Sequence, residues 1–396
     1  MIFKKLIILA IFTTLILGAC SKNTSTNGSS ISMFRGNLQH TGFYNTKGVE
    51  KFSGLKWEFT TEGSIYSSVT VSNGTALFGS DDTYVYALDA KDGQLKWKFK
   101  TEGPVRSTPT VINNTAYFFS GDGNLYAVDI SNGNKKWDFK TGRKDEAKDT
   151  WDYFQSSPSV LDGVIYFGAG DNNFYALDAG NGTLKWKTST MPKSIENLYI
   201  GVHSSPAISN GIAYFGNYFG YMMALDIKTG EQLWKLDKGS SVQSSPSIYE
   251  NLVLFGGRNT YLHAVDTKTG EEKWKFNAPN GSWILSSPAV YNNTVYFGTS
   301  DAFSVHALDI DTGTEKWKFK APGAVHSSPA ITEGLIYFGT SNNYGEDYGG
   351  VFYVLDLETG KEKWNYKTSG DIISSPVIAD GVIYIATVDG KVLALE

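Results

Sequence analysis

One pattern, repeated along the chain, constrains the fold more than any other feature of the sequence. It consists of an Asp, a Gly four residues later and a Trp four residues after the Gly, as in ALDIDTGTEKW at residues 307–317. Seven copies end at Trp97, Trp137, Trp186, Trp234, Trp274, Trp317 and Trp364, at intervals of 40 to 49 residues. Such a period is typical of proteins built from stacked copies of one supersecondary unit.

A second landmark counts the units. Ser-Thr-Pro occupies 107–109, Ser-Ser-Pro begins at 156, 204, 244, 286, 327 and 374, and Ser67-Ser68-Val69 is the opening variant, which makes eight units. Between the landmarks, segments such as GLIYFGTS (334–341) are rich in aromatic and β-branched residues, and they predict short strands. Asn-Gly or Asp-Gly pairs at 73, 162, 210 and 380 predict tight turns between them.

The step from Asp to Trp has a physical explanation. We expect the Asp to end a strand and to accept hydrogen bonds from N–H groups of the following turn, while the Gly supplies a positive φ. The Trp then begins the next strand with a ring that one four-stranded sheet cannot cover by itself. The sequence therefore predicts an all-β protein, an eight-bladed β-propeller with four-stranded antiparallel blades over residues 34–396, with each Trp packed between adjacent blades.

The two ends of the repeat region complete each other. The eighth unit stops at KVLALE (391–396) without a Trp strand, and GLKWEFTT (54–61) is a Trp strand with no unit before it. We predict that the Trp57 strand becomes the outer strand of the last blade and closes the ring. Trp57 thereby joins the seven repeat Trp residues as a blade-docking side chain.

The first 20 residues form a separate segment. MIFKKLIILAIFTTLILGAC contains two early lysines, a short apolar run and small residues before Cys20, which is the only cysteine. The segment resembles a bacterial lipoprotein signal peptide (1–19), cleaved before a Cys20 that carries the lipid; a plain signal peptide or an uncleaved anchor is the alternative. Residues 20–33 would then be the lipidated Cys and a flexible tether to a membrane.

The charge balance bears on the partners. The formal net charge is −5, and loss of Lys4 and Lys5 with a signal peptide makes it more negative. Nucleic acids and anionic lipids are bound chiefly by clustered Lys and Arg, so we expect no nucleic-acid partner. Lysines on the Trp strands, as in KWKFK at 96–100 and 316–320, are interpreted as a solvated outer edge.

The repeat also resembles a known family. AxDxxTGxxxW together with SSP and YFG is similar to the pyrroloquinoline-quinone-type (PQQ-like) propeller repeat from about residue 34 to the end, and MFRGNLQHTG (33–42) is similar to the segment before the first blade in that family. Two branches share the fold: quinoprotein dehydrogenases, and non-catalytic lipoproteins like BamB, which assist outer-membrane protein assembly. The resemblance implies the fold more strongly than the function.

The residues offer little for catalysis. The dehydrogenases of this family hold their quinone against a disulfide between adjacent cysteines and use a calcium ion, whereas this chain has one cysteine and lacks their large insertions. The five histidines show no zinc spacing, and no nucleophile elbow, phosphate loop or EF-hand pattern is present. Acidic residues at 143–152 and 342–350 are interpreted as solvated loops. We expect no catalytic residue, no metal and no cofactor.

Three long insertions are candidates for a partner surface. In a blade with strands a to d from the centre outward, the d-to-a and b-to-c connections emerge on the same face, and all three insertions fall in those connections. Aromatic residues dominate many protein interfaces. The candidate partner-binding residues are Trp151, Tyr153, Tyr199, Tyr344 and Tyr348. Tolerated loop length and local packing are the alternatives.

A second candidate site lies at the expected central funnel. The residue directly before each Ser-Ser pair varies from unit to unit, although the residue before it is apolar in every unit. The candidate funnel residues are Tyr66, Arg106, Gln155, His203, Gln243 and His326. A funnel filled by water and by neighbouring blades is the alternative.

Together these features predict a monomeric, non-catalytic lipoprotein of the cell envelope that binds other envelope proteins, with the outer-membrane assembly machinery among them. In a Gram-negative cell it would be anchored in the outer membrane and face the periplasm. Two alternatives remain open: a quinone- or sugar-binding enzyme that uses the funnel, and a ligand-binding or sensory lipoprotein of a Gram-positive cell.

Overall fold

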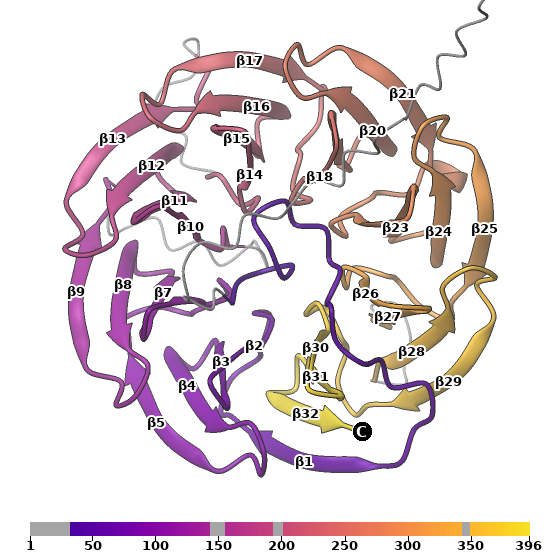
Figure 1. Ribbon diagram of the computed structural model, residues 1–396, viewed down its shortest axis with the longest axis horizontal. Coiled ribbons are helices and arrows are strands. Elements are labelled where there is room, and N and C mark those ends of the chain that lie inside the picture. The colour runs from indigo at the N-terminus through magenta and orange to yellow at the C-terminus, as the bar shows by residue number, and fades with distance from the viewer. Residues whose placement is uncertain (1–31, 143–154, 193–200, 343–348) are drawn as a thin grey trace, which may run out of the picture.

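The strands form a closed ring around one axis (Figure 1). The computed structural model describes residues 32–142, 155–192, 201–342 and 349–396, in which 32 strands make eight four-stranded sheets. Every strand pair within a sheet is antiparallel. The predicted eight-bladed β-propeller is therefore confirmed. The helical content of the described residues is one 3₁₀ turn, η1 (Pro279–Gly281).

Each blade runs from a short inner strand a to a long outer strand d. The a strands are β2 (Thr70–Ser72), β6 (Thr110–Ile112), β10 (Ser159–Leu161), β14 (Ala207–Ser209), β18 (Ser247–Tyr249), β22 (Ala289–Tyr291), β26 (Ala330–Thr332) and β30 (Val377–Ala379). The b strands are β3 (Thr75–Gly79), β7 (Thr115–Phe119), β11 (Val164–Gly168), β15 (Ile212–Gly216), β19 (Leu252–Phe255), β23 (Thr294–Gly298), β27 (Leu335–Gly339) and β31 (Val382–Ala386). The c strands are β4 (Tyr84–Asp89), β8 (Asn124–Asp129), β12 (Asn173–Asp178), β16 (Tyr221–Asp226), β20 (Tyr261–Asp266), β24 (Ser304–Asp309), β28 (Val351–Asp356) and β32 (Lys391–Leu395). The d strands are β5 (Leu95–Lys100), β9 (Lys135–Lys140), β13 (Leu184–Ser189), β17 (Gln232–Asp237), β21 (Glu272–Asn277), β25 (Glu315–Lys320), β29 (Glu362–Lys367) and β1 (Leu55–Thr60).

Burial explains the composition of these strands. The b and c strands are covered on both faces by neighbouring blades, and in most of them at least four consecutive residues are buried. The d strands alternate instead: in β5 the ring of Trp97 is buried while Lys96, Lys98 and Lys100 are exposed. Lysines on an exposed edge discourage pairing with another sheet. In all eight c–d pairs the register shifts beside the Trp, a β-bulge that increases the local twist.

The last blade is completed by the N-terminal strand. Its sheet has the order β1–β32–β31–β30, so the strand that carries Trp57 pairs with the strand that ends the chain. Both Ser53 N–H and Gly54 N–H donate to the Glu396 carbonyl, and Lys56 forms an ion pair with the Glu396 side chain at 2.6 Å. The predicted ring closure by the Trp57 strand is confirmed.

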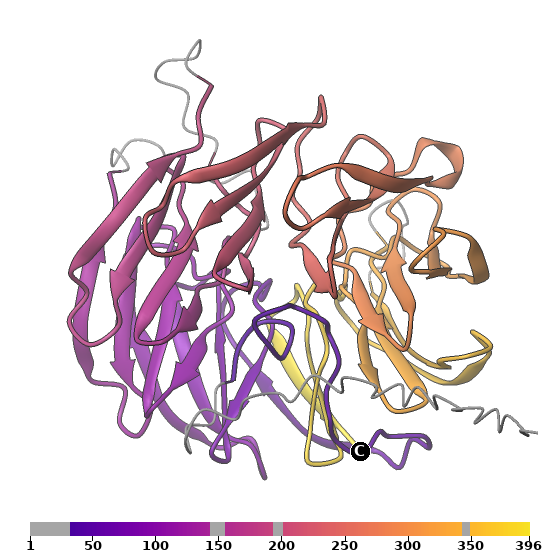
Figure 2. The ribbon, with the colours of Figure 1, turned by 45° about the horizontal axis from the view of Figure 1, so that its top comes forward.

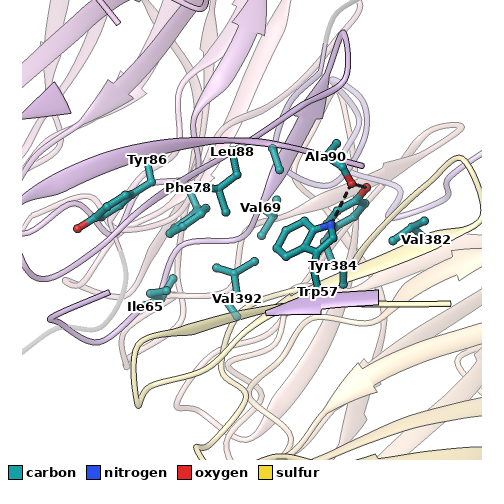
Figure 3. Packing of buried hydrophobic residues seen from close by; sticks show 13 residues of the cluster. Trp57, Ile65, Val69, Phe78, Tyr86, Leu88, Ala90, Val382, Tyr384 and Val392 are labelled. Carbon is teal, nitrogen blue, oxygen red and sulfur yellow. Dashed lines mark hydrogen bonds between the residues drawn. The ribbon is translucent and has the colours of Figure 1, made fainter. Parts of the chain in front are cut away.

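Each of the eight Trp side chains reaches into the following blade. The Trp57 indole Nε1–H donates to the Ala90 carbonyl at 3.1 Å and its ring packs in a cluster drawn from both blades (Figure 3). The equivalent bonds of the other seven span 2.7 to 3.2 Å. For Trp364 the acceptor is the Val49 carbonyl, because the outer strand of the last blade is β1 and no c-to-d turn joins it to β32.

The Asp–Gly turns are built to receive these rings. Asp89 Oδ1 accepts from Lys91 N–H at 2.9 Å, and Gly93 has φ 74°. A Cβ on Gly93 would lie 2.8 Å from the Trp57 ring, and six further turn glycines face the Trp of the preceding blade in the same way. The Gly therefore supplies both the turn conformation and the space for the indole.

An N-terminal strap, residues 32–54, crosses one end of the central axis (the indigo segment in Figure 1). Carbonyl groups of residues 38, 39, 41 and 42 accept N–H groups from β14, β18, β22 and β26 in turn, at 2.7 to 2.8 Å. The fully buried Arg35 donates to the Pro288 and Pro329 carbonyls at 2.8 and 2.5 Å. The strap thereby joins the inner strands of four blades and closes the base of the funnel.

Candidate functional site

The propeller has two faces that differ in the connections emerging on them. The d-to-a and b-to-c connections emerge on one face, here called the loop face, while the a-to-b and c-to-d turns emerge on the opposite one, called the turn face (Figure 2). The strap lies on the turn face, where residues 43–51 share a groove with Glu333 and Asp380 of two a-to-b turns. The candidate partner residues Trp151, Tyr153, Tyr199, Tyr344 and Tyr348, and the candidate lipidation site Cys20, lie outside the described residues.

The six candidate funnel residues gather around the axis. Tyr66, Arg106, Gln155, His203, Gln243 and His326 all line one central cavity that opens on the loop face. The two remaining blades contribute Leu285 and Ile373, and Phe34 of the strap forms part of the base. The polar residues therefore come from blades 1 to 5 and 7, and the wall beside blades 6 and 8 is apolar.

The strongest charge in the funnel is neutralised within it. The Arg106 guanidinium pairs with the Asp81 carboxylate through two bonds, Nε–Oδ1 and Nη2–Oδ2, both of 2.9 Å. The side chains of this pair are 10% and 22% exposed. The guanidinium also lies 5.0 Å from the centre of the Tyr66 ring, and Arg106 N–H donates to Gln155 Oε1 at 3.0 Å. The arrangement offers hydrogen bonds rather than net charge to a ligand.

The histidines of the funnel do not form a pair. His203 meets the Tyr218 ring edge to face at 5.8 Å, whereas His326, three blades away, has its Nδ1 3.2 Å from Ser341 Oγ. Burial lowers the pKa of His326 to about 4, so its imidazole is neutral near pH 7. Each of the two histidines therefore contacts a residue of its own blade, His203 through a ring contact and His326 through a hydrogen bond.

A ring of hydroxyl groups lies below the variable residues. In seven blades the backbone N–H of the second residue of the Ser-Ser or Ser-Thr pair donates to the corresponding hydroxyl of the next blade, at 2.9 to 3.1 Å. One of these bonds, from Ser375 to Ser68, joins the last blade to the first. The first Ser instead ties its own blade together, as Ser67 does through Gly79. The Ser-Ser-Pro landmark is therefore explained by ring assembly.

The funnel does not fit the quinone that the fold family suggests. The cavity has a volume of about 40 Å³, room for roughly two or three water molecules. Phe34 covers its base, and the sequence has one cysteine and so no adjacent pair. Among the residues that the structure describes, no cluster of three or more His, Cys, Asp or Glu side chains could hold a metal ion. No helix in the described ranges is long and apolar enough to cross a membrane.

Sequence reasoning missed a cluster at the funnel rim. Tyr218, Arg258 and Trp283 come from three consecutive blades, and the guanidinium of Arg258 lies against both aromatic rings. A signal was available in the sequence, because Trp283 stands outside the Asp–Gly–Trp pattern. It also missed the buried Arg35 and the half-buried Phe34, since nothing in the repeat indicates where the strap lies.

The chain matches one protein family in sequence and several solved structures in fold. The family model described as "Outer membrane protein assembly factor BamB" matches residues 53–150, 149–259, 219–346 and 344–396. The crystal structure of BamB from Moraxella catarrhalis is similar with a TM-score of 0.66 and 14% identity, covering 87% of this chain and 99% of that one. A quinohemoprotein alcohol dehydrogenase from Comamonas testosteroni has a TM-score of 0.73 and 14% identity, covering 92% and 80%. The designed protein Ika8 has a TM-score of 0.70 and 17% identity, covering 86% of this chain and 99% of Ika8. At these identities the structures share the fold alone, and no curated protein sequence matches the chain.

Proposed function

We propose, from the premise that this chain belongs to the family of the outer membrane protein assembly factor BamB, that it is a non-catalytic scaffold which binds other proteins of the cell envelope. The family match, which runs through all the blades, is the observation that carries this proposal. Fold alone cannot supply it, because dehydrogenases share the same propeller.

The distribution of constant and variable residues supports a binding surface on the loop face. The repeated Trp, Gly and Ser residues are used between blades, where their contacts hold the ring. The variable residues Tyr66, Arg106, Gln155, His203, Gln243 and His326 line the funnel on the loop face. Binding residues concentrate on connections carried by a rigid framework.

A lipid anchor at Cys20 would favour one orientation. The described chain begins at Ser32, which pairs with Val111 of β6 near the axis, and the strap then follows the turn face. Residues 21–31 can span at most roughly 40 Å. Attachment there would hold the turn face toward the membrane and leave the loop face open to partners in the envelope.

The proposal is tested by partner capture. Trp151 and Tyr348, replaced together by Ser, should weaken capture of envelope proteins by the immobilised protein and leave its melting temperature nearly unchanged. Trp274→Ser is the matched control: it removes a ring that packs against Gly313 and donates to the Ile310 carbonyl, and should lower the melting temperature. Equal capture by the double variant and the parent protein contradicts the assignment of those loops.

The enzyme alternative has its own test. Purified protein incubated with pyrroloquinoline quinone and calcium should show neither a stable quinone spectrum nor oxidation of alcohols or sugars, because the funnel residues do not fit that cofactor. Saturable dye reduction with a simple alcohol would overturn the proposal in favour of catalysis.

A further inference from the structure

Three side chains from neighbouring blades meet at the rim of the funnel, and we call them the Arg258 cluster. Tyr218 and Arg258 lie in the b-to-c connections of blades 4 and 5, and Trp283 lies in the d-to-a connection that enters blade 6. The Arg258 guanidinium is 4.9 Å from the centre of the Trp283 ring and 5.6 Å from that of Tyr218. The Trp283 side chain is 41% exposed.

Backbone hydrogen bonds position the cluster. Arg258 N–H donates to the Ser241 carbonyl at 3.0 Å, and Ser300 N–H donates to the Trp283 carbonyl at 3.0 Å. Tyr218 meets His203 of the funnel wall edge to face. The aromatic surface is therefore held by the blades and is continuous with the funnel.

Comparison with the other described arginines shows what Arg258 lacks. Arg35 donates to two backbone carbonyls, and Arg106 pairs with a carboxylate through two bonds. Arg258 has one long contact, from Nη1 to the Tyr218 hydroxyl at 3.4 Å, and its Nε is buried without an acceptor among the described residues. No carboxylate in the described ranges forms an ion pair with it. A guanidinium carries five N–H donors in a planar fork that matches a carboxylate.

The aromatic neighbours narrow the class of ligand. Cation–π contacts hold a guanidinium in place but accept none of its hydrogen bonds in the plane. Because Nε is buried, the Nη end of the Arg258 guanidinium is the part that remains available to an acceptor. The cluster offers a single cation on a protein with a net charge of −5. A singly charged carboxylate suits it better than a phosphate, which is usually bound by several basic groups. The exposed Trp283 ring beside the fork suits an apolar side chain next to that carboxylate.

We propose that the Arg258 cluster binds a glutamate or aspartate side chain in an acidic, partly apolar segment of a partner protein. Arg258 pairs with the carboxylate, and Trp283 covers the adjacent apolar residue. This inference rests on the proposed scaffold function, because it assigns to the partner one contact on the loop face. Arg and Trp at such positions commonly contribute the largest share of binding energy in an interface.

Arginine side-chain NMR tests the inference directly, since the chain has only four arginines. The probe is a short peptide of alternating Leu and Glu, and its matched control has Gln in place of Glu. We expect the Arg258 Nε–H signal, assigned from its loss in Arg258→Lys, to shift saturably with the Glu peptide at millimolar concentration. The Arg35 and Arg106 signals should stay in place.

Variants separate a specific site from a general charge effect. Arg258→Lys keeps the charge but loses the fork, and should weaken peptide binding, followed by fluorescence anisotropy, by at least about tenfold; Trp283→Leu should weaken it as well. The control is Lys235→Ala on the outer strand β17, which removes a cation lying 4.2 Å from the centre of the Tyr221 ring. This variant should bind the peptide as the parent does.

Three outcomes would overturn the inference: equal binding of the Glu and Gln peptides, full binding by Arg258→Lys, or an equal shift of the Arg258 signal by inorganic phosphate, which would assign the cluster to phosphate.

Partner capture separates this inference from the scaffold proposal. If the parent protein captures envelope partners and Arg258→Lys captures them equally, the cluster assignment fails and the scaffold stands; if the parent captures none, the scaffold itself fails.

Discussion

At the scale of single residues, the fold depends on a contact between one blade's Trp and the next blade's Gly. Trp57 packs against Gly93 and donates to the Ala90 carbonyl, and the same geometry recurs around the ring. The Gly was predictable from the turn. Its contact with the Trp ring was not, because the two residues belong to different repeats. A substitution there should therefore affect the blade interface as well as the turn.

Gly93→Ala tests that contact. Its φ of 74° costs an Ala roughly 1–2 kcal/mol, and the new Cβ would lie 2.8 Å from the Trp57 ring, which adds about 1–3 kcal/mol of overpacking. Gly74→Ala is the control, since it has φ 68° and nothing within 4 Å of its Cβ. Urea unfolding should show the larger loss of unfolding free energy for Gly93→Ala. Equal losses would mean that the Trp–Gly contact contributes little.

The buried His40 predicts how stability depends on pH. Burial, and then the charge of Arg35, lowers its pKa to about 3 from an ordinary value of 6.5. Above pH 6.5 the histidine is largely neutral in both the folded and the unfolded protein. Below pH 6.5 the histidine takes up a proton in the unfolded chain first, so the free energy of unfolding falls as the pH drops toward 3. Between about pH 7.5 and about pH 5 one such histidine removes about 2 kcal/mol. In urea titrations, the His40→Gln variant should lose about 2 kcal/mol less unfolding free energy on acidification than the parent protein does. Identical pH profiles of the two proteins would exclude His40 as a source of the acid sensitivity.

At the scale of elements, the sequence predicted the blades well and the strap poorly. Strand alternation, the turn pairs and the complementary ends together indicated eight blades and the pairing of β1 with β32, because these signals are local or repeat with a fixed period. The strap has no such period. Its hydrogen bonds to the inner strands β14 to β26 run to residues some 170 to 290 positions away, as between Leu38 and Ile208 or Gly42 and Ile331, so its course follows from the assembled ring.

Deletion of residues 54–61 tests ring closure. The variant loses β1 and the buried Trp57, leaves the edge of β32 unpaired, and should lose roughly 5 kcal/mol or more of unfolding free energy. Deleting residues 21–30, which precede the described chain, is the control and should leave the melting temperature unchanged. Full thermal stability of the first variant would contradict the closure.

At the scale of the whole molecule, the two faces carry different features. The turn face carries the strap, and the loop face carries the funnel and the Arg258 cluster. The variable funnel positions were identifiable from the sequence because they break the rule of an otherwise regular repeat. Of the Arg258 cluster, only Trp283 was marked by the sequence, because it stands outside the Asp–Gly–Trp pattern. Its contact with Arg258 was not predictable, since the members occupy different positions in their units and meet only through the curvature of the ring.

Cys20→Ala tests the anchor on which this orientation depends. If Cys20 carries the lipid, the variant should move from the membrane fraction to the soluble envelope fraction, because its only acylation site is gone. Fractionation and a gel-mobility comparison with the parent protein provide the measurement. A variant that stays in the membrane fraction with unchanged mobility would show that the anchor assignment is wrong.

Photo-crosslinking in the source cell tests the central claim most directly, that the loop face is where this scaffold holds its partners. A photoreactive residue is placed at exposed positions Glu102 or Pro322 on the loop face, and at exposed positions Asn181 or Glu358 on the turn face. We predict crosslinks to proteins of the outer-membrane assembly machinery from the loop-face positions and few from the turn-face positions. Crosslinks to such proteins from the turn face alone would contradict the account.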